Sequence, residues 1–416
     1  MENTTVAVIG LGYIGLPTAA VLATRGAQVI GVDVNPATVE AVNDGIVPFV
    51  EPDLAATVAG AVTQGRLKAT TETPPADVYI VAVPTPLRGD HSADLSYVDA
   101  AADGIAPQLR GGELVILEST SPPGTTRHLA ERLLAARPDL SLEDAPGRPG
   151  LNVAHCPERV LPGRIMIEIV TNDRIIGGLT PAAAERARDL YATFCQGQLL
   201  VTDAVTAEMS KLVENSYRDV NIAFANELSL IAERLGIDVW ELIRLANHHP
   251  RVNILQPGPG VGGHCIAVDP WFVVEAAPEE ARLIRTAREV NDAKPDHVVE
   301  RVLAHARRFR APRVAALGLA FKPDIDDLRE SPSRRIVAQL AQALPEGHVA
   351  AVEPHIETLP DDLAAMPNVR LTSLEDAVAD ADIVLVLVDH AQFRAANPAA
   401  LGLAEKVLVD VKAVWT

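Results

Sequence analysis

The stretch VAVIGLGYIGLP, residues 6–17, decides the fold of this chain. It predicts a short β-branched strand that runs through a glycine-rich turn into a helix. A second predicted strand, residues 28–32, ends at Asp33, which lies 18 positions after the last glycine of the turn. Glycines at this spacing let a pyrophosphate approach the helix N-terminus, and the acid accepts hydrogen bonds from a ribose diol. The order is typical of a dinucleotide-binding Rossmann unit, and an Asp in this place favours NAD over NADP because it repels a 2′-phosphate.

Two further predicted strands, residues 78–83 and 114–118, are followed by turn-rich segments that contain Thr85 and Thr126. Ligands bind outside the carboxyl ends of the strands in a parallel sheet, so both threonines are candidate cofactor contacts. Threonine also caps helices, and the sequence leaves that alternative open for both. The residues predicted here to hold NAD are Gly10, Gly12, Tyr13, Ile14, Gly15, Asp33, Thr85 and Thr126.

The alternation of strands and helices restarts near residue 310. The segment AFKPDIDDLRES, residues 320–331, follows the first strand of this second series and lacks the GxGxxG pattern. Lys322 and Arg329 lie in it, where an anion would bind, so we expect a ligand different from that of the first unit. The strands predicted for the series are residues 313–317, 348–352, 369–371, 383–388 and 407–411.

Length and pattern together predict three domains, because 416 residues are too many for one compact core. We predict an NAD-binding Rossmann-like domain over residues 1–204 and a central helical domain over residues 205–309. A second αβ domain, which binds another nucleotide-type ligand, is predicted over residues 310–416. The fold class is therefore α/β, with two Rossmann-like αβ domains joined by a long central helical segment.

The central segment contains a helical pattern over residues 206–235 with a polar stripe along one side. Glu208, Lys211, Asn215 and Arg218 recur at spacings of three and four, so they share one helix face. Apolar residues lie beside the stripe. Both a solvated surface and a polar face turned toward a buried site fit this pattern.

The loop PGPGVGGHCIAVDPW, residues 257–271, is too rich in glycine and proline for regular structure. It contains Cys265, with His264 before it and Asp269 four residues later. The loop alone allows two interpretations of Cys265: a small buried hydrophobe, or a nucleophile that reacts as a thiolate.

Composition excludes several classes of protein. A formal charge of −19 argues against nucleic acid and anionic membranes as partners. Three cysteines, Cys156, Cys195 and Cys265, are too few for a disulfide framework and indicate a reducing, cytoplasmic setting. Residues 4–24 carry no charge, but their glycines and proline indicate a strand, turn and helix rather than a membrane span.

Seven motifs spread over nearly the whole chain resemble those of the UDP-glucose/GDP-mannose dehydrogenase family, in the family's order. They are GLGYIGLP, the PTP turn, ESTSPPGTT, CPERVLPG, the helix with Lys211 and Asn215, GGHC and AFKPDIDDLRES. The UDP-glucose branch of the family usually has Ser before the cysteine and Lys before the aspartate. His264 and Val268 occupy these positions here, which is similar to the branch that oxidises UDP-N-acetylhexosamines.

The resemblance implies a four-electron oxidation at C6 of a UDP-sugar, from alcohol to carboxylate, with two NAD⁺ used in succession. UDP-N-acetylmannosamine is the implied substrate, and UDP-N-acetylglucosamine or another UDP-hexose is the alternative. Cys265 is the implied nucleophile, Lys211 the acid/base, Asn215 an oxyanion donor and Glu158 the base for hydrolysis. For Asp269, a proton relay and a hydrogen-bond acceptor that fixes the loop remain equal alternatives. A regulator without turnover is disfavoured, because both the cysteine and the lysine are present.

The resemblance also implies a set of substrate contacts, a homodimer and no metal. Arg251 is contributed across the dimer interface in the family, and His249 is a hypothetical sensor of the sugar's configuration. Arg329 is assigned to the cofactor, whereas Cys156 and Cys195 are assigned structural roles. The implied substrate contacts are Arg159, Val160, Lys211, Asn215, Arg218, His249, Arg251, Gly262, Phe321 and Lys322.

Overall fold

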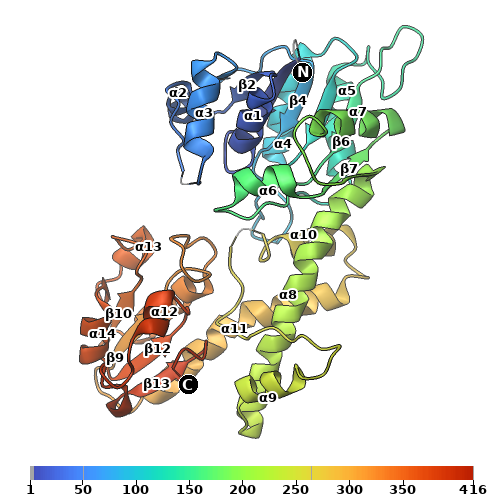
Figure 1. Cartoon of the computed structure of the whole chain (residues 1–416). Helices are drawn as coiled ribbons and strands as arrows, with labels where there is room; N and C mark the ends of the chain where they lie inside the picture. The colour runs from blue at the N-terminus through green and yellow to red at the C-terminus, as the bar shows by residue number, and fades with distance from the viewer. Residues whose placement is uncertain (1–3, 50, 264, 416) are drawn as a thin grey trace. The chain divides into compact units, whose positions relative to one another are not determined.

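A computed structural model describes residues 4–49, 51–263 and 265–415 of the chain (Figure 1). His264, on which part of the substrate expectation rests, lies outside these residues. The chain divides into two compact units. The first consists of residues 1–214 and 275–278, and the second of residues 215–274 and 279–416. The three domain boundaries expected from the sequence stay predictions.

The first unit is built on an eight-stranded sheet in the order β3-β2-β1-β4-β5-β6-β7-β8. This order places the point where the chain reverses direction across the sheet between β1 and β4, which is where dinucleotides bind in such folds. The Rossmann-like prediction is confirmed. The strands are β1 (Thr5–Ile9), β2 (Gln28–Val32), β3 (Leu67–Thr70), β4 (Val78–Val81), β5 (Leu114–Leu117), β6 (Asn152–His155), β7 (Arg174–Gly178) and β8 (Leu199–Asp203).

Helices cover both faces of this sheet and bury two apolar layers. Helices α1, α3 and α7 pack on one layer, and α4 and α5 pack on the other. Because both faces are covered, the central strands are apolar along their whole length, as parallel strands require. The helices of the unit are α1 (Gly15–Thr24), α2 (Pro36–Asn43), α3 (Leu54–Thr63), α4 (Ser96–Ile105), α5 (Thr125–Ala136), α6 (Ile165–Thr171) and α7 (Pro181–Tyr191).

The sequence also predicts a strand over residues 152–154, where β6 lies, but it does not predict β3, β7 or β8. Strand β7 has the sequence RIIGG, in which a charged residue and two glycines hide the strand pattern. It pairs with β6 in antiparallel fashion, which corrects the expectation of a parallel sheet at this one place. The chain returns from β6 through the short helix α6 without the long crossover helix that a parallel connection needs.

The second unit contains a five-stranded, fully parallel sheet in the order β11-β10-β9-β12-β13. All five strands predicted for this part of the chain are present, so the second Rossmann-like domain is confirmed. The strands are β9 (Arg313–Leu317), β10 (His348–Val352), β11 (Val369–Leu371), β12 (Ile383–Val386) and β13 (Val407–Asp410). The helices that accompany them are α12 (Pro332–Ala343), α13 (Asp361–Ala364), α14 (Leu374–Asp380) and α15 (Ala391–Ala395).

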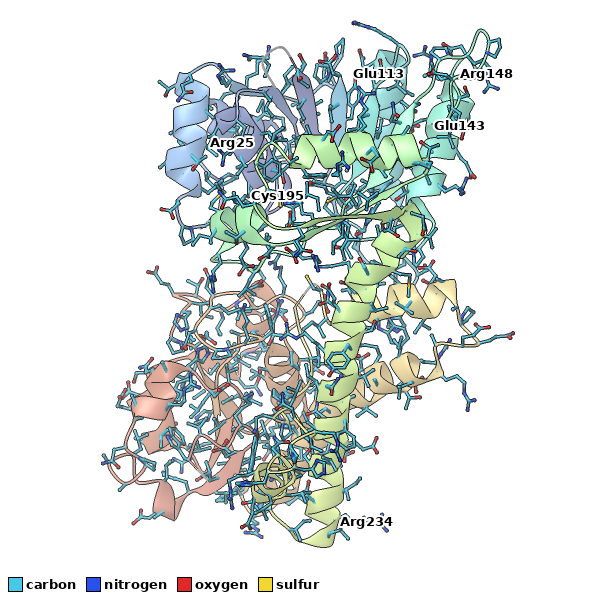
Figure 2. All side chains as sticks on the ribbon, turned by 45° about the vertical axis from the view of Figure 1, so that its right-hand side comes forward. Arg25, Glu113, Glu143, Arg148, Cys195 and Arg234 are labelled. Atoms are coloured by element: carbon cyan, nitrogen blue, oxygen red, sulfur yellow. The ribbon has the colours of Figure 1, made fainter. Side chains whose placement is uncertain are left out.

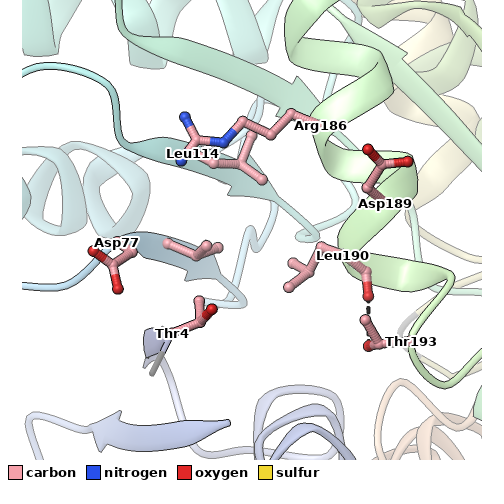
Figure 3. Close-up of a pocket in the computed structure, with 8 residues that line it drawn as sticks. Thr4, Asp77, Leu114, Arg186, Asp189, Leu190 and Thr193 are labelled. Atoms are coloured by element: carbon pink, nitrogen blue, oxygen red, sulfur yellow. Dashed lines mark hydrogen bonds between the residues drawn. The ribbon is translucent and has the colours of Figure 1, made fainter. Parts of the chain in front are cut away.

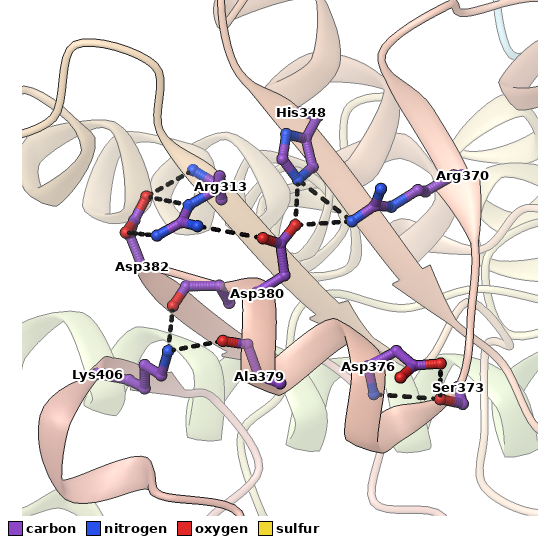
Figure 4. A network of polar contacts seen from close by, with 10 residues as sticks. Arg313, His348, Arg370, Ser373, Asp376, Ala379, Asp380, Asp382 and Lys406 are labelled. Atoms are coloured by element: carbon purple, nitrogen blue, oxygen red, sulfur yellow. Dashed lines mark hydrogen bonds and ion pairs between the residues drawn. The ribbon is translucent and has the colours of Figure 1, made fainter.

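The amino ends of these strands are tied by a network of charged side chains (Figure 4). Arg313, at the start of β9, pairs with Asp382 at 2.6 Å and with Asp380 at 3.1 Å. Asp380 also accepts from His348 at 2.9 Å and from Arg370 at 2.7 Å. This network occupies the amino edge of the sheet, whereas ligands of parallel sheets bind at the opposite, carboxyl edge.

A single 32-residue helix, α8 (Ala204–Leu235), carries the chain from the first unit into the second. It confirms the predicted helix and the long central helical segment, and is about 48 Å long at 1.5 Å per residue. Three further helices follow it: α9 (Val239–Ala246), α10 (Asp269–Ala276) and α11 (Arg282–Ala306). Helix α11 contains Pro295, which leaves the carbonyl of Asn291, four residues earlier, without a donor from the helix backbone.

Candidate active site

The turn between β1 and α1 requires glycine at two positions and leaves a third open. A side chain at Gly10 would lie 2.4 Å from the carbonyl oxygen of Ala82, and Gly10 has φ of +94°. A side chain at Gly15 would lie 1.8 Å from the carbonyl oxygen of Gly10. At Gly12, no described atom lies within 4 Å of that position. The turn is therefore packed on the protein side and open where a pyrophosphate would approach, which fits NAD.

Asp33 lies at the end of β2 and is turned toward this glycine turn. Its Oδ2 accepts from the backbone N–H of Leu11 at 3.0 Å, and its Oδ1 accepts from that of Asn35 at 2.9 Å. The carboxylate is thus fixed in the place from which it would accept hydrogen bonds from a ribose. Beside the turn, the ring of Tyr13 stacks on that of Phe49, with centroids 4.2 Å apart, and Ile14 is half-buried.

Both threonines predicted to touch the cofactor have protein partners. The hydroxyl of Thr126 is fully buried and donates to the carboxylate of Glu208 at 2.6 Å. The same carboxylate accepts from the backbone N–H groups of Gly124 and Thr126, so Glu208 caps the start of α5. Thr85 donates to the carbonyl of Thr120. Neither threonine caps a helix through its own hydroxyl, because Thr126 binds Glu208 and Thr85 binds a loop carbonyl. The cofactor contacts of both threonines stay predictions.

A cavity of about 440 Å³ lies at the opposite edge of the first sheet (Figure 3). Its walls include Thr4, Asp77 and Leu114, which stand at the amino ends of β1, β4 and β5, and Arg186 on α7. Ligands of parallel sheets bind at the carboxyl ends of the strands. This cavity is consequently not the cofactor site.

Glu158, expected to act as a base, lies in the loop after β6 and is 7% exposed. Its carboxylate pairs with the buried guanidinium of Arg174 at 2.8 Å and accepts from the backbone N–H of Arg159 at 2.7 Å. Arg159 itself pairs with Glu214 at 2.7 Å, and Val160 packs against the apolar layer. The CPERVLPG segment is thus held in one conformation by the ion pairs and hydrogen bond of Glu158 and Arg159.

The two remaining cysteines have environments that suit structural roles. Cys156 is buried, and burial raises the pKa of its thiol to about 12, so it stays protonated. Cys195, labelled in Figure 2, is half-buried and contacts the carbonyl oxygen of Asn172 at 3.3 Å. None of the three cysteines, all in the described part of the chain, forms a disulfide.

The polar stripe of α8 changes in burial along its length. Glu208 is buried, Lys211 and Asn215 are half-buried, and Arg218 is exposed. Asn215 donates through Nδ2 to the carboxylate of Asp269 at 2.5 Å, and Asp269 is 2% exposed. This contact supports the role of Asp269 as an acceptor that fixes the cysteine loop, while its role as a proton relay stays a prediction.

Cys265 lies one turn before helix α10 and is half-buried. Its carbonyl accepts from the backbone N–H groups of Val268 and Asp269 at 3.0 and 2.8 Å. Before it, a side chain at Gly262 would lie 2.5 Å from the carbonyl oxygen of Glu330 and 2.8 Å from Cβ of Phe321. The structure therefore packs the cysteine loop directly against the AFKPDIDDLRES segment, which the sequence placed in a separate domain.

Within that segment, Lys322 and Arg329 have different surroundings. The ammonium of Lys322 lies 5.8 Å from the ring centroid of Phe321, at a cation–π distance. Arg329 is exposed and pairs with Asp327 at 2.7 Å. Its backbone carbonyl accepts from the N–H of Gly263 at 3.2 Å, so the segment and the cysteine loop share a hydrogen bond. A cofactor contact of Arg329 stays a prediction.

The turn after β9 repeats two hydrogen bonds of the glycine turn after β1. Gly318 donates to Val352, and Glu353 accepts from the N–H of Leu319 at 2.8 Å, as Asp33 does from Leu11. Here the fully buried imidazole of His390 lies 3.1 Å from Glu353, so this carboxylate has a partner within the protein.

His390 also belongs to a group of possible metal ligands with Asp324 and His355, whose donor atoms lie within 4.8 Å of one another. Its Nδ1 accepts the backbone N–H of Asp324 at 3.0 Å, so the lone pair that would bind an ion is in use. The group is consistent with a hydrogen-bonded cluster, and the absence of a required metal stays a prediction.

His249 and Arg251 are exposed and lie in the turn that follows α9. The described hydrogen bonds of this turn lie within it. Nδ1 of His249 accepts from the N–H of Arg251 at 3.3 Å. The side-chain amide of Asn247 donates to the carbonyl of Ile254 and accepts from its N–H. Helix α9 follows the end of α8, about 30 Å along the helix from Asn215. These contacts do not link the two residues to those around Cys265.

Models of one protein family match almost the whole chain. The NAD binding domain of the UDP-glucose/GDP-mannose dehydrogenase family matches residues 4–195, its central domain residues 205–293 and its UDP binding domain residues 315–416. The chain belongs to this family. It is an NAD-dependent UDP-sugar dehydrogenase, and the glycine turn and Asp33 lie in the NAD binding domain. The described helices include none with the length and apolar character needed to cross a membrane.

Members of the family with very similar sequences carry two different substrate names. An NDP-N-acetyl-D-galactosaminuronic acid dehydrogenase of Ralstonia nicotianae is 58% identical over 99% of this chain and 96% of its own. A UDP-N-acetyl-D-mannosamine dehydrogenase of Escherichia coli is 54% identical over the full length of both. Among solved structures, the UDP-D-ManNAc dehydrogenase of Pyrococcus horikoshii superposes with a TM-score of 0.87 at 38% identity, covering 99% of this chain and 96% of that one.

A buried carboxylate that was not singled out from the sequence, Glu118, lies in the NAD binding domain at the end of β5. It is 1% exposed and accepts from the hydroxyl of Tyr191 at 2.6 Å and from that of Thr18 at 3.2 Å. Burial raises the pKa of Glu118 to about 7, and the nearby charge of Arg174 opposes this shift. Its position directly before the STSPPGTT turn was the signal available in the sequence.

Glu118 should make the stability of this dehydrogenase pH-dependent. The folded state holds its proton more tightly than the unfolded chain, whose carboxyl titrates near 4.5. Its contribution to stability is therefore full below pH 4.5 and is lost as the pH rises through 7. The glutamine of Glu118→Gln cannot ionise, so this variant lacks that loss. Between pH 5 and pH 8, the free energy of unfolding of the parent should fall by about 2–3 kcal/mol more than that of Glu118→Gln. Urea unfolding of both proteins at pH 5 and pH 8 measures this difference. An equal fall in the free energy of unfolding of the two proteins would contradict the prediction.

Proposed function

We propose that this protein oxidises UDP-N-acetyl-D-mannosamine at C6 to UDP-N-acetyl-D-mannosaminuronate, in two successive NAD-dependent steps. The observation that carries the proposal is the placement of Cys265. Its loop is packed against the segment with Phe321 and ends on Asp269, which Asn215 holds. A thiol held between a nucleotide-binding segment and a polar helix face suits covalent capture of an aldehyde.

In the first oxidation, Lys211 takes the proton of the C6 hydroxyl, directly or through Asp269 or a water. Bound NAD⁺ supplies the hydride acceptor for each of the two oxidations. The sulfur of Cys265 then bonds to the aldehyde carbon, and the carbonyl oxygen takes up a proton to give a thiohemiacetal. The thiohemiacetal becomes a thioester by losing its hydroxyl proton to Lys211 and a hydride to the bound acceptor. Lys211 and the second N–H of the Asn215 amide donate to the oxygen that gains negative charge.

Hydrolysis completes the sequence. The oxygen of a water molecule bonds to the acyl carbon, the carbon–sulfur bond breaks and Cys265 leaves as a thiolate. Glu158 takes one proton from the water, and the product acid loses the other to solvent. The ion pair of Glu158 with Arg174, at 2.8 Å, holds the carboxylate in one orientation.

Local positive charges recognise the UDP portion despite the acidic composition of the chain. Lys322 and Arg251 carry the charge that a pyrophosphate requires, and the ring of Phe321 supports the nucleotide. The remaining contacts proposed for the substrate are those of Arg159, Val160, Arg218, His249 and Gly262. We place the enzyme in the cytoplasm.

The name of the 58% identical relative favours a second candidate substrate, a UDP-N-acetylgalactosamine-type sugar. N-acetylmannosamine, N-acetylgalactosamine and N-acetylglucosamine differ from one another only in configuration at one or two ring carbons. Few protein contacts can therefore distinguish their UDP derivatives. Initial rates of NADH formation with the UDP derivatives of N-acetylmannosamine, N-acetylgalactosamine, N-acetylglucosamine and glucose decide among them. The highest kcat/KM should be that of N-acetylmannosamine. A preference for any of the other three would reject the substrate assignment while leaving the reaction type intact.

We further propose that the enzyme is a homodimer that uses the exposed face of α8. Tyr217, Phe224, Ile231 and Leu235 recur at spacings of seven and four and are each more than 40% exposed. A continuous apolar stripe on one helix is typical of a protein interface. The exposed Arg251, which lies in the turn after α9, would then reach the site of the other subunit, as the resemblance implies.

Mixed dimers test this arrangement. When chains carrying Cys265→Ala are coexpressed with chains carrying Arg251→Ala, the mixed dimer contains one site with both residues only if Arg251 acts across the interface. We expect each variant alone to be nearly inactive and the mixed dimer to recover about half of the parent activity per dimer. Mixed dimers that stay as inactive as the separate variants would show that Arg251 acts within its own chain.

A further inference from the structure

Helix α8 presents three polar side chains on one face within the second unit, two of them fully buried and one half-buried. Asn215, Asp219 and Asn226 follow one another at spacings of four and seven, so they share that face. Asp219 and Asn226 are fully buried. Buried polar groups persist where their hydrogen bonds are satisfied, so their partners indicate what they hold.

The cysteine loop is attached to this face at both ends. At its start, the backbone N–H of Gly258 donates to Oδ1 of Asn226 at 2.9 Å, in a buried contact. At its end, the carboxylate of Asp269 accepts from Asn215 at 2.5 Å. Cys265 lies between these two attachment points, which are about 16 Å apart along the helix.

The attachment at Asn226 is itself supported by helix α11. Nδ2 of Asn226 donates to Oδ1 of Asn291 at 2.9 Å, and Nδ2 of Asn291 donates to Asp219 at 2.8 Å. Arg288 completes the chain of contacts by pairing with Asp219 at 2.7 Å. Because each amide has both its donor and its acceptor in use, the orientation of Asn226 toward the loop is fixed.

Backbone contacts continue the support toward the cysteine. A side chain at Gly260, which has φ of +141°, would lie 3.2 Å from the carbonyl oxygen of Asn291 and 3.3 Å from Cδ of Pro295. Pro295 has no N–H to donate to that carbonyl, so the carbonyl of Asn291 lacks a helix hydrogen bond where the loop packs on α11. The loop therefore rests on α11 between its two attachments to α8.

We propose that Asn226, oriented by Asn291, is a positioning residue for the catalytic thiol, and that with Asn215 it clamps the loop at both ends so that Cys265 is held in place for attack. The proposal rests on the proposed function for the role of the thiol. Asn226 and Asn291 do not touch the reacting atoms in this assignment, whereas Asn215 both holds the loop and donates to the oxygen of the reacting centre. Misplacement of a reacting group by about 1 Å can lower a rate by about 100-fold, so loss of one attachment should affect kcat strongly.

The test compares Asn226→Ala with Asn368→Ala. Asn368 is an asparagine of the same unit whose amide holds two carbonyls at the end of α12, at 2.8 and 3.1 Å, away from the cysteine loop. We expect both variants to lose similar thermal stability. Only Asn226→Ala should lower kcat, by about 10- to 100-fold, with KM for NAD⁺ within about threefold of the parent. Hydrogen exchange should accelerate in peptides covering residues 258–269 of Asn226→Ala and not in those of the control.

Asn226→Ser provides the same comparison if the alanine variant fails to fold, because its hydroxyl can bond to a carbonyl of its own helix. A kcat within twofold of the parent, or exchange in residues 258–269 equal to that of Asn368→Ala, would overturn the proposal. Hydrogen exchange needs no substrate, so it separates failure of the clamp from failure of the proposed function. In the latter case the parent itself would show no oxidation of a UDP-sugar.

Discussion

A Cys265→Ala variant is expected to form no UDP-uronate, with the rate of carboxylate formation lowered by at least about 10³-fold. Without the thiol, the aldehyde from the first oxidation has no covalent attachment to the enzyme and cannot become a thioester. Cys265 begins the turn that leads into α10, and a methyl group keeps the backbone contacts of that turn. The measurement is product analysis by mass spectrometry after incubation with UDP-N-acetylmannosamine and NAD⁺.

Cys195→Ala is the matched control for this experiment. Cys195 is half-buried like Cys265, but it lies in the first unit and contacts the carbonyl of Asn172. Its replacement should leave kcat within twofold of the parent. If Cys265→Ala formed the carboxylate at more than a tenth of the parent rate, the thiol would not be the nucleophile.

Replacing Arg288 by Met should cause the largest loss of stability. The guanidinium of Arg288 is 2% exposed, and its partner Asp219 is fully buried. Removal of one member of a buried ion pair leaves an uncompensated charge and costs about 3–5 kcal/mol. The second unit should therefore unfold at a temperature lower by on the order of 10 °C, which differential scanning calorimetry measures.

Arg282→Met, at the exposed start of the same helix, is the control and should shift the transition by no more than about 2 °C. The first unit does not contain the Arg288 pair, so a separate transition of that unit should stay in place. Equal shifts in the two variants would show that the buried pair contributes nothing beyond an ordinary surface arginine.

Local patterns in the sequence were sufficient for most of the fold. The glycine turn, Asp33 and the apolar strands depend on neighbouring residues, so a short window contains the whole signal. Strand β7 could not be predicted from a short window. Its first residue is a buried arginine whose charge is balanced by Glu158, 16 positions earlier in the chain. A strand that is stabilised by a distant partner has no pattern of its own.

The site shows the same division between local and distant signals. The irregular loop around Cys265 was evident from its glycines and prolines. The attachment of that loop to Asn226 and Asn291 was not, because these residues are 65 positions apart and look like ordinary polar residues of two helices. Glu208 shows the converse case. It belonged to the predicted polar stripe, but its carboxylate caps α5, 82 positions earlier.

The central claim, a four-electron oxidation at a single site, is tested most directly by the stoichiometry of NADH formation. A limiting, weighed amount of UDP-N-acetylmannosamine is incubated to completion with excess NAD⁺, and NADH is measured by absorbance. Two NADH per sugar consumed, with the uronate as the product, is the predicted result. One NADH per sugar, with an aldehyde released to solution, would contradict the claim.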